Sequence, residues 1–226
     1  MMTPHAHPTT KTVFGLPTAL FLLLAANVLP ELVLQLADRG IVLSPALRAW
    51  AYALGAFQPD LTRWPGQRFG GQSLTMFLTY GFLHTGLSHV AINMLGLVWL
   101  GRLILSYRTP ETFVMLYLMS LVGAAEVYSL IGMQGGTMVG ASGALFGLFG
   151  AYAVDAGLFA SSRPQAAEAG VQFFRLALAT VLLALSDVGS QALLGSSPAA
   201  WQAHAGGFLT GAVIALLSPP RFRAMQ

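Results

Sequence analysis

The sequence lacks cysteine altogether and has few charged residues. Its 226 residues include no Cys, and Asp, Glu, Lys and Arg together make up 8% of the chain. The absence of cysteine excludes disulfides, thiolate metal sites and a cysteine nucleophile. Soluble domains carry about 25% charged residues. A chain with 55% hydrophobic residues and a mean hydropathy of +0.68 cannot cover a surface that faces water, so the sequence predicts a polytopic membrane protein.

The positive charge of the chain is small and does not form a cluster. The formal net charge is +3, and the 11 Lys and Arg residues are scattered along the sequence. Nucleic-acid binding needs clustered basic residues, whereas membrane proteins keep Lys and Arg on their cytoplasmic loops. We therefore expect membrane lipids as partners and no nucleic acid.

Apolar runs long enough to cross a bilayer recur along the chain. A transmembrane helix needs about 20 mostly apolar residues. The sequence predicts six such helices, at about 15–37, 87–106, 112–132, 140–159, 171–188 and 201–218. The expected fold class is all-α, a bundle of six transmembrane helices. The bundle would span residues 14–218, between short cytoplasmic tails at 1–13 and 219–226.

Basic residues lie mostly on one side of these predicted spans. With the N-terminus inside, the inner segments hold Lys11, Arg102, Arg108, Arg163, Arg175, Arg221 and Arg223, and the outer ones hold Arg39, Arg48, Arg63 and Arg68. Cytoplasmic loops carry the excess of Lys and Arg, and long loops count little. We therefore expect a multi-pass protein of the plasma membrane with both termini cytoplasmic. The long first loop, rich in aromatic residues, suits the headgroup interface.

Three of the predicted helices carry polar residues near the same end. The second begins with His84, His89 and Asn93, the fourth with Ser142, and the sixth with His204. These three helices run in the same direction, so their polar ends lie at one membrane depth. In the expected topology this depth is near the outer face, and the inverted topology would move the whole set to the cytoplasmic side.

Small residues predict close packing between the fourth and sixth helices. They recur at helical spacing, as Gly140, Gly143, Gly147 and Gly150 on the fourth and as Gly207 and Gly211 on the sixth. Such spacing lets membrane helices approach backbone to backbone. Packing alone would explain the glycines. Because His204 falls on the same face as Gly207, the packing would also bring its imidazole to the helix of Ser142.

A serine beside a histidine suits acyl transfer. A serine hydroxyl is a weak nucleophile until a base removes its proton, and a neutral imidazole is a suitable base near neutral pH. Ser142 is therefore the candidate nucleophile and His204 the candidate base. A lone membrane histidine could instead cap a backbone carbonyl or bind a lipid headgroup.

Acyl transfer also needs hydrogen-bond donors for a developing oxyanion. His89 and Asn93 are four residues apart, on one helical face, and both carry N–H donors. The backbone N–H of Ser142, at a helix start, has no partner within the helix. These three donors could form an oxyanion site, although a polar pair that bridges two helices would also explain His89 and Asn93. His84 is expected in the preceding loop, as structural support.

The sequence lacks the residues that other hydrolytic chemistries in membranes require. The chain has no H-E-x-x-H metal motif, and Ala144 breaks the G-x-S-x-G pattern of the soluble nucleophile elbow. Asp155 and Asp187 are expected at opposite membrane depths, so they cannot form an aspartyl pair. Glu126, within the third predicted helix, is interpreted as structural or water-facing. We expect a serine–histidine dyad, with no metal and no cofactor.

Three motifs together resemble those of the rhomboid family of intramembrane serine proteases. They are H-x4-H-x3-N from His84 to Asn93, G-x-S-G from Gly140 to Gly143, and H-x2-G-x3-G from His204 to Gly211. The resemblance covers the second to sixth helices and implies a six-helix, rhomboid-like bundle. It implies single-pass transmembrane proteins as substrates, cut in or near the membrane.

The resemblance also implies roles for individual residues. Ser142 would be the nucleophile and His204 the general base, with His89, Asn93 and the Ser142 N–H at the oxyanion. Structural support would come from His84, Gly140, Gly143, Phe146 and Gly207.

The chain departs from the family pattern at three places. Thr75-Met76 stand where many members have Trp-Arg, and Leu103 to Ser106 stand where many have a glutamate. Phe146 stands where some members stack a tyrosine on the catalytic histidine, and it can stack without offering a hydroxyl. A non-catalytic rhomboid-like protein that binds membrane-protein clients is the alternative function, and a small transporter or channel is another. The first does not need both Ser142 and His204, and the second would not confine its polar residues to one depth.

Overall fold

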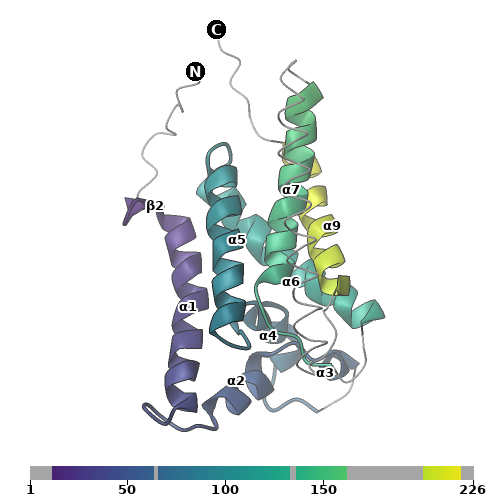
Figure 1. Cartoon of the computed structure of the whole chain (residues 1–226). Coiled ribbons are helices and arrows are strands. Elements are labelled where there is room, and N and C mark those ends of the chain that lie inside the picture. The colour runs from purple at the N-terminus through teal and green to yellow at the C-terminus, as the bar shows by residue number, and fades with distance from the viewer. Residues whose placement is uncertain (1–11, 64–65, 133–135, 162–200, 220–226) are drawn as a thin grey trace.

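The chain folds mainly into a bundle of helices. A computed structural model describes residues 12–63, 66–132, 136–161 and 201–219 (Figure 1). Its long helices are α1 (Thr18–Asp38), α5 (Leu87–Leu105), α6 (Pro110–Ile131), α7 (Ser142–Ser161) and α9 (Trp201–Leu217). They correspond to five of the six predicted spans. The remaining span, at 171–188, lies outside the described residues, so the count of six stays a prediction.

Three of the described helices are long and apolar enough to cross a membrane. By length and composition these are α1, α5 and α6, while α9 is apolar but has only 17 residues. Large apolar side chains such as Leu22, Leu95 and Leu209 are exposed on the bundle surface. A polytopic membrane protein presents such side chains to lipid rather than to water.

A small hairpin precedes the first helix of this mostly helical structure. Strand β1 (Thr12–Val13) pairs antiparallel with β2 (Leu16–Pro17). Phe14 and Gly15, between the strands, have φ angles of 50° and 75°. Positive φ at both central residues gives a turn whose twist matches that of the two strands. Thr12 and Val13, predicted to belong to the tail, are therefore part of this hairpin.

The first loop folds into short helices at one end of the bundle. These are α2 (Leu47–Gly55), α3 (Asp60–Arg63), α4 (Gln72–Thr79) and the 3-10 helix η1 (Tyr80–Phe82). Figure 1 shows α2, α3 and α4 at the end where α5 and α7 begin. The fully buried ring of Phe57 packs on Phe77, Tyr80 and Tyr128. Phe57 and Met138 also exchange backbone hydrogen bonds of 2.9 Å, which tie this loop to the segment before Ser142.

A buried ion pair connects the segment after α5 with α7 and with the residue that follows α9. Arg108 donates from Nε and Nη2 to Asp155 Oδ2 and Oδ1, at 2.7 and 2.6 Å. Its Nη1 donates to the carbonyl of Ser218 at 2.8 Å. Arg108 is 4% exposed and Asp155 0%, so each charge depends on the other for compensation. The sequence placed Asp155 at the inner end of its helix but did not reveal this partner, which is 47 residues away.

Glycines bring α7 and α9 into backbone contact. A Cβ at Gly207 would overlap the carbonyl of Gly143, and a Cβ at Gly211 would overlap that of Gly147. Helix α6 packs against the same pair, because Ser120 occupies the space beside Gly147. The predicted close approach of these two helices is confirmed, and α6 is a third participant that the glycine spacing did not indicate.

Gly211→Ala is expected to destabilise the protein, because the added methyl group would push α9 away from the Gly147 carbonyl. Overpacking of this kind costs about 1–3 kcal/mol. Gly157→Ala is the matched control, since none of the described residues lies within 4 Å of the position of its Cβ. That change should be neutral or stabilising by up to about 1 kcal/mol through helix propensity. Thermal unfolding in detergent, followed by circular dichroism, measures both, and equal melting temperatures would contradict the packing argument.

Candidate active site

Ser142 and His204 lie within hydrogen-bonding distance, although they are 62 residues apart in the chain. Ser142 is the first residue of α7, and His204 lies in the first turn of α9. The distance from His204 Nε2 to Ser142 Oγ is 3.0 Å. His204 is buried and Ser142 half-buried. An imidazole whose Nε2 is unprotonated can accept the serine proton across this contact. The catalytic roles of both residues stay a prediction.

An aromatic ring holds the plane of the His204 imidazole. Phe146 lies one helical turn after Ser142, on the same face of α7. The ring centroids of Phe146 and His204 are 4.2 Å apart, and the ring planes differ by 3°. This stacking restricts tilting of the imidazole, which keeps Nε2 directed at Ser142.

Gly140 lies before α7, not on it. The sequence predicted a helix from residue 140, with Gly140 on the glycine face, but α7 begins at Ser142. The φ of Gly140 is +121°, a conformation that is open to glycine and incompatible with a right-handed helix. A Cβ at Gly140 would lie 2.9 Å from His89 Nε2. The glycine therefore lets the His89 ring reach the chain just before Ser142.

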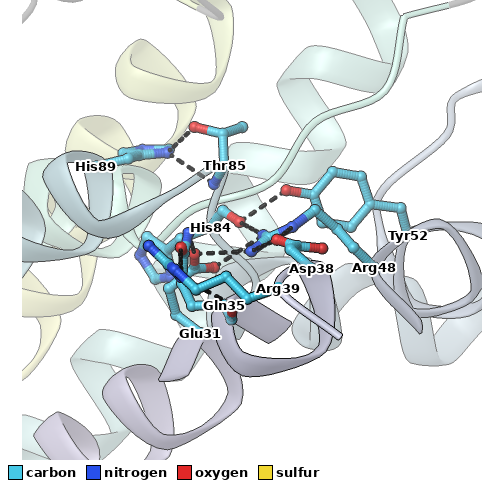
Figure 2. Close-up of polar contacts among 9 residues, drawn as sticks. All are labelled: Glu31, Gln35, Asp38, Arg39, Arg48, Tyr52, His84, Thr85 and His89. Carbon is cyan, nitrogen blue, oxygen red and sulfur yellow. Dashed lines mark hydrogen bonds and ion pairs between the residues drawn. The ribbon is translucent and has the colours of Figure 1, made fainter. Parts of the chain in front are cut away.

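The His89 ring lies between Thr85 and Gly140. Its Nδ1 is 3.0 Å from Thr85 Oγ1 and 3.5 Å from the Thr85 backbone nitrogen (Figure 2). A backbone N–H can only donate, so Nδ1 is the acceptor and the proton of the neutral ring is on Nε2. Nε2 is on the side of Gly140, which places an N–H donor two residues from Ser142. The role of this N–H as an oxyanion donor stays a prediction.

Asn93 is buried on α5 and binds its own helix. Its Nδ2 donates to the carbonyl of His89 at 2.9 Å. This bond uses one of the two N–H groups of the amide. The bond lies within α5, so it is not the polar bridge between two helices that was the alternative explanation for this residue.

His84 is fully buried in the segment between η1 and α5. Its ring meets the His89 ring edge-on, with centroids 5.1 Å apart. Neither ring nitrogen has a hydrogen-bond partner among the described residues. Burial, and to a smaller degree the neighbouring His89, lower the pKa of His84 to about 3. The ring is therefore neutral near pH 7, as a buried histidine without a charged partner must be.

Glu126 and Met76 are two further positions that the sequence singled out. Glu126 is exposed on α6, and Met76, where many family members have arginine, is fully buried in the core. Within the part of the chain that the structure describes, no group of three His, Asp or Glu side chains could hold a metal ion.

Comparison with protein families identifies the chain. The family model described as Rhomboid domain matches residues 71–221, which is 151 of the 226 residues. The chain belongs to the rhomboid family. It is therefore a rhomboid-family membrane protein, and this family contains intramembrane serine proteases as well as inactive members. A comparison with curated proteins gave no match.

The rhomboid match includes every candidate of the dyad and the oxyanion site, but the structure adds residues that precede it. Arg48 and Tyr52 both donate to the carbonyl of His84, at 2.9 and 2.7 Å. Nothing in the sequence pattern links these two residues to His84, because they are 36 and 32 residues away. Thr85 was also missed, although its place directly after His84 and four residues before His89 could have indicated it.

The lowered pKa of His84 predicts a pH-dependent stability. Between about pH 6.5, the ordinary value, and about pH 3, the unfolded chain binds a proton at this residue and the folded chain does not. The free energy of unfolding should therefore fall as the pH decreases below about 6.5, by up to about 1.4 kcal/mol per pH unit from this residue. Melting temperatures of wild type and His84→Asn between pH 7 and pH 4 measure the effect. The variant should lose less stability on acidification, and parallel curves would refute this assignment.

Proposed function

We propose that this rhomboid is an intramembrane serine endopeptidase that cuts single-pass transmembrane proteins in or near the membrane. The observation that carries the proposal is the 3.0 Å contact between His204 Nε2 and Ser142 Oγ. Two helices in backbone contact hold this pair, and the stacked ring of Phe146 restricts the imidazole. An inactive member of the family would need neither the contact nor the stack.

The proposed reaction has two steps that use the same two residues. Ser142 Oγ attacks the carbonyl carbon of the scissile peptide while His204 Nε2 takes the hydroxyl proton. The tetrahedral intermediate then collapses, the C–N bond breaks, and the amine leaves with the proton from His204. A water molecule, deprotonated by His204, attacks the acyl-enzyme, and Ser142 recovers its proton as the acid product departs.

Three donors would stabilise the oxyanion in both steps. They are the Nε2–H of His89, the side-chain amide of Asn93 and the backbone N–H of Ser142. The Ser142 N–H is among the first of α7, where N–H groups have no partner within the helix and the helix dipole is positive. The acceptor position of His89 Nδ1 supports the first donor, because it leaves the ring proton on Nε2. Removing one such donor lowers kcat by about 100-fold to 1,000-fold in serine proteases.

The proposal also includes the membrane in which the protein lies and its orientation there. Residues 14–218 would form the protease domain in the plasma membrane, in contact with lipids and without a nucleic-acid partner. The tails at 1–13 and 219–226 would be cytoplasmic, and the active site would face outward. The distribution of Lys and Arg supports this orientation, and the position of α2 to α4 at the end of the bundle where α7 begins is consistent with an interfacial first loop.

A fluorophosphonate probe tests the dyad without a known substrate. Wild-type protein in detergent should be labelled, and both Ser142→Ala and His204→Ala should abolish the labelling, because the serine needs its base. Ser120→Ala is the matched control, since Ser120 is a buried serine on α6 beside Gly147, and this variant should label as wild type does. Absence of labelling in folded wild type, in several detergents and in lipid, would favour the non-catalytic family member that binds clients.

A substrate with a stiffened cut region tests the need for local unwinding. A peptide bond inside a helix is shielded by its own hydrogen bonds, so the segment must unwind before Ser142 can attack it. Replacing a glycine beside the cut site by alanine adds about 1 kcal/mol of helix stability, and cleavage should slow by up to about fivefold. The same replacement two helical turns away is the control, and equal cleavage rates for both would contradict the unwinding step.

A further inference from the structure

An arginine of the first loop binds the chain next to the proposed site. Arg48, on α2, donates from Nε to Asp38 Oδ2 at 2.8 Å and from Nη1 to the carbonyl of His84 at 2.9 Å (Figure 2). It also donates to both carboxylate oxygens of Glu31, at 3.0 Å each. One guanidinium therefore joins α1, α2 and the segment that leads into α5.

The ion pair holds the guanidinium in one position. The Glu31 side chain is fully buried, and that of Arg48 is 18% exposed. Two-point contact between a guanidinium and a carboxylate fixes direction as well as distance. Glu31 also accepts from Gln35 Nε2 at 2.8 Å, which fixes the carboxylate in turn. Arg48 is thus a rigid donor toward His84, unlike a solvated surface arginine.

The carbonyl of His84 receives two donors, Arg48 Nη1 and the hydroxyl of Tyr52, at 2.9 and 2.7 Å. A carbonyl oxygen has two lone pairs, so both are used. The peptide group is planar, and its N–H points opposite to its C=O. Fixing the His84 carbonyl therefore fixes the direction of the Thr85 N–H, which lies 3.5 Å from His89 Nδ1.

We propose that Arg48 is a positioning residue that sets the proton position and the ring orientation of His89 through the peptide group between His84 and Thr85. The inference rests on the proposed function, in which the Nε2–H of His89 is an oxyanion donor. Hydrogen bonds to a carbonyl polarise its peptide group and strengthen the N–H as a donor. The Thr85 N–H then keeps Nδ1 as the acceptor, and the proton stays on Nε2. Without Arg48 only the Tyr52 hydroxyl holds the His84 carbonyl, so the peptide plane is less restrained and either nitrogen of His89 can carry the proton.

The residues that hold the His84 carbonyl lie outside the part of the chain that the family model matches. Glu31, Arg48 and Tyr52 all precede residue 71, where the match begins. The matched region supplies the dyad and the oxyanion residues, and the segment before it supplies the group that orients one of them. Met76 is buried where many family members have an arginine, and the arginine that contacts the His84 carbonyl is Arg48 of α2.

Nitrogen NMR of histidine rings tests the proposal directly. In protein labelled with 15N in its imidazoles, wild-type His89 should appear as the neutral tautomer with its proton on Nε2. Arg48→Met alone would leave Glu31 charged and buried, so Arg48→Met is combined with Glu31→Gln. This double variant should show a mixture of His89 tautomers. Its maximal rate of fluorophosphonate labelling should fall about 10-fold to 100-fold, at an unchanged probe concentration for half-maximal rate.

Two further variants separate positioning from folding. Tyr52→Phe removes one donor to the His84 carbonyl and keeps the ion pair, so it should shift the His89 tautomer in the same direction by a smaller amount. Asp38→Asn is the matched control, because Asp38 is 35% exposed and its loss leaves the bonds from Arg48 to Glu31 and His84 in place. This control should keep the wild-type tautomer and labelling rate.

The outcomes distinguish the two proposals. If wild type is labelled and His89 keeps its proton on Nε2 in both the double variant and Tyr52→Phe, the positioning role is wrong and the dyad stands. If wild type is not labelled, the proposed function is wrong. The tautomer of His89 still decides in that case whether Arg48 orients the ring.

Discussion

Helices α7 and α9 pack backbone to backbone, and the proposed site depends on that approach. Gly207 and Gly211 lie against the carbonyls of Gly143 and Gly147. Ser142 is adjacent to Gly143, and His204 is one turn before Gly207 on its helix. The register that aligns the glycines therefore also brings His204 Nε2 to 3.0 Å from Ser142 Oγ. Membrane helices gain little from the hydrophobic effect when they associate, so contacts between small residues have to hold them together.

Polar contacts fix this helix pair at both ends. Arg108 joins Asp155 of α7 to the carbonyl of Ser218, which follows α9. At the other end, the N–H of Gly140 donates to the carbonyl of Tyr80 at 3.0 Å. The chain before Ser142 is therefore anchored to η1, and the start of α7 cannot move independently of the first loop. A nucleophile and its base need such fixed positions, because small displacements of reacting groups slow a reaction strongly.

Buried carboxylates in the described part of the chain are paired with arginines. A charge in a bilayer is costly unless another group compensates it, and Glu31 and Asp155, the two fully buried carboxylates among the described residues, are each bound by an arginine. The two pairs differ in what else they contact. Arg108 binds the carbonyl of Ser218, directly after α9, while Arg48 binds the carbonyl of His84, next to the proposed oxyanion residues. Under the positioning proposal, this difference distinguishes the Arg48 pair, which contacts the candidate site, from the Arg108 pair, which connects helices.

The sequence by itself determined the membrane class, the approximate positions of the five long helices that the structure describes, and the candidates Ser142, His204, His89 and Asn93. These inferences depend on local properties, namely apolar length and residue spacing along one helix. The stacking of Phe146 on His204 was expected only from the resemblance to the rhomboid family, and the structure contains it.

Only the tertiary structure decided the turn at Gly140, the short helices of the first loop and the partners of Arg48 and Arg108. Each of these depends on segments that lie far apart in the chain and meet only after folding, so no local spacing encodes them. The contact between Ser142 and His204 depends on both the spacing in the sequence and the packing in the tertiary structure. The glycine spacing predicted that their helices meet, and the packed backbones set the distance at which they do.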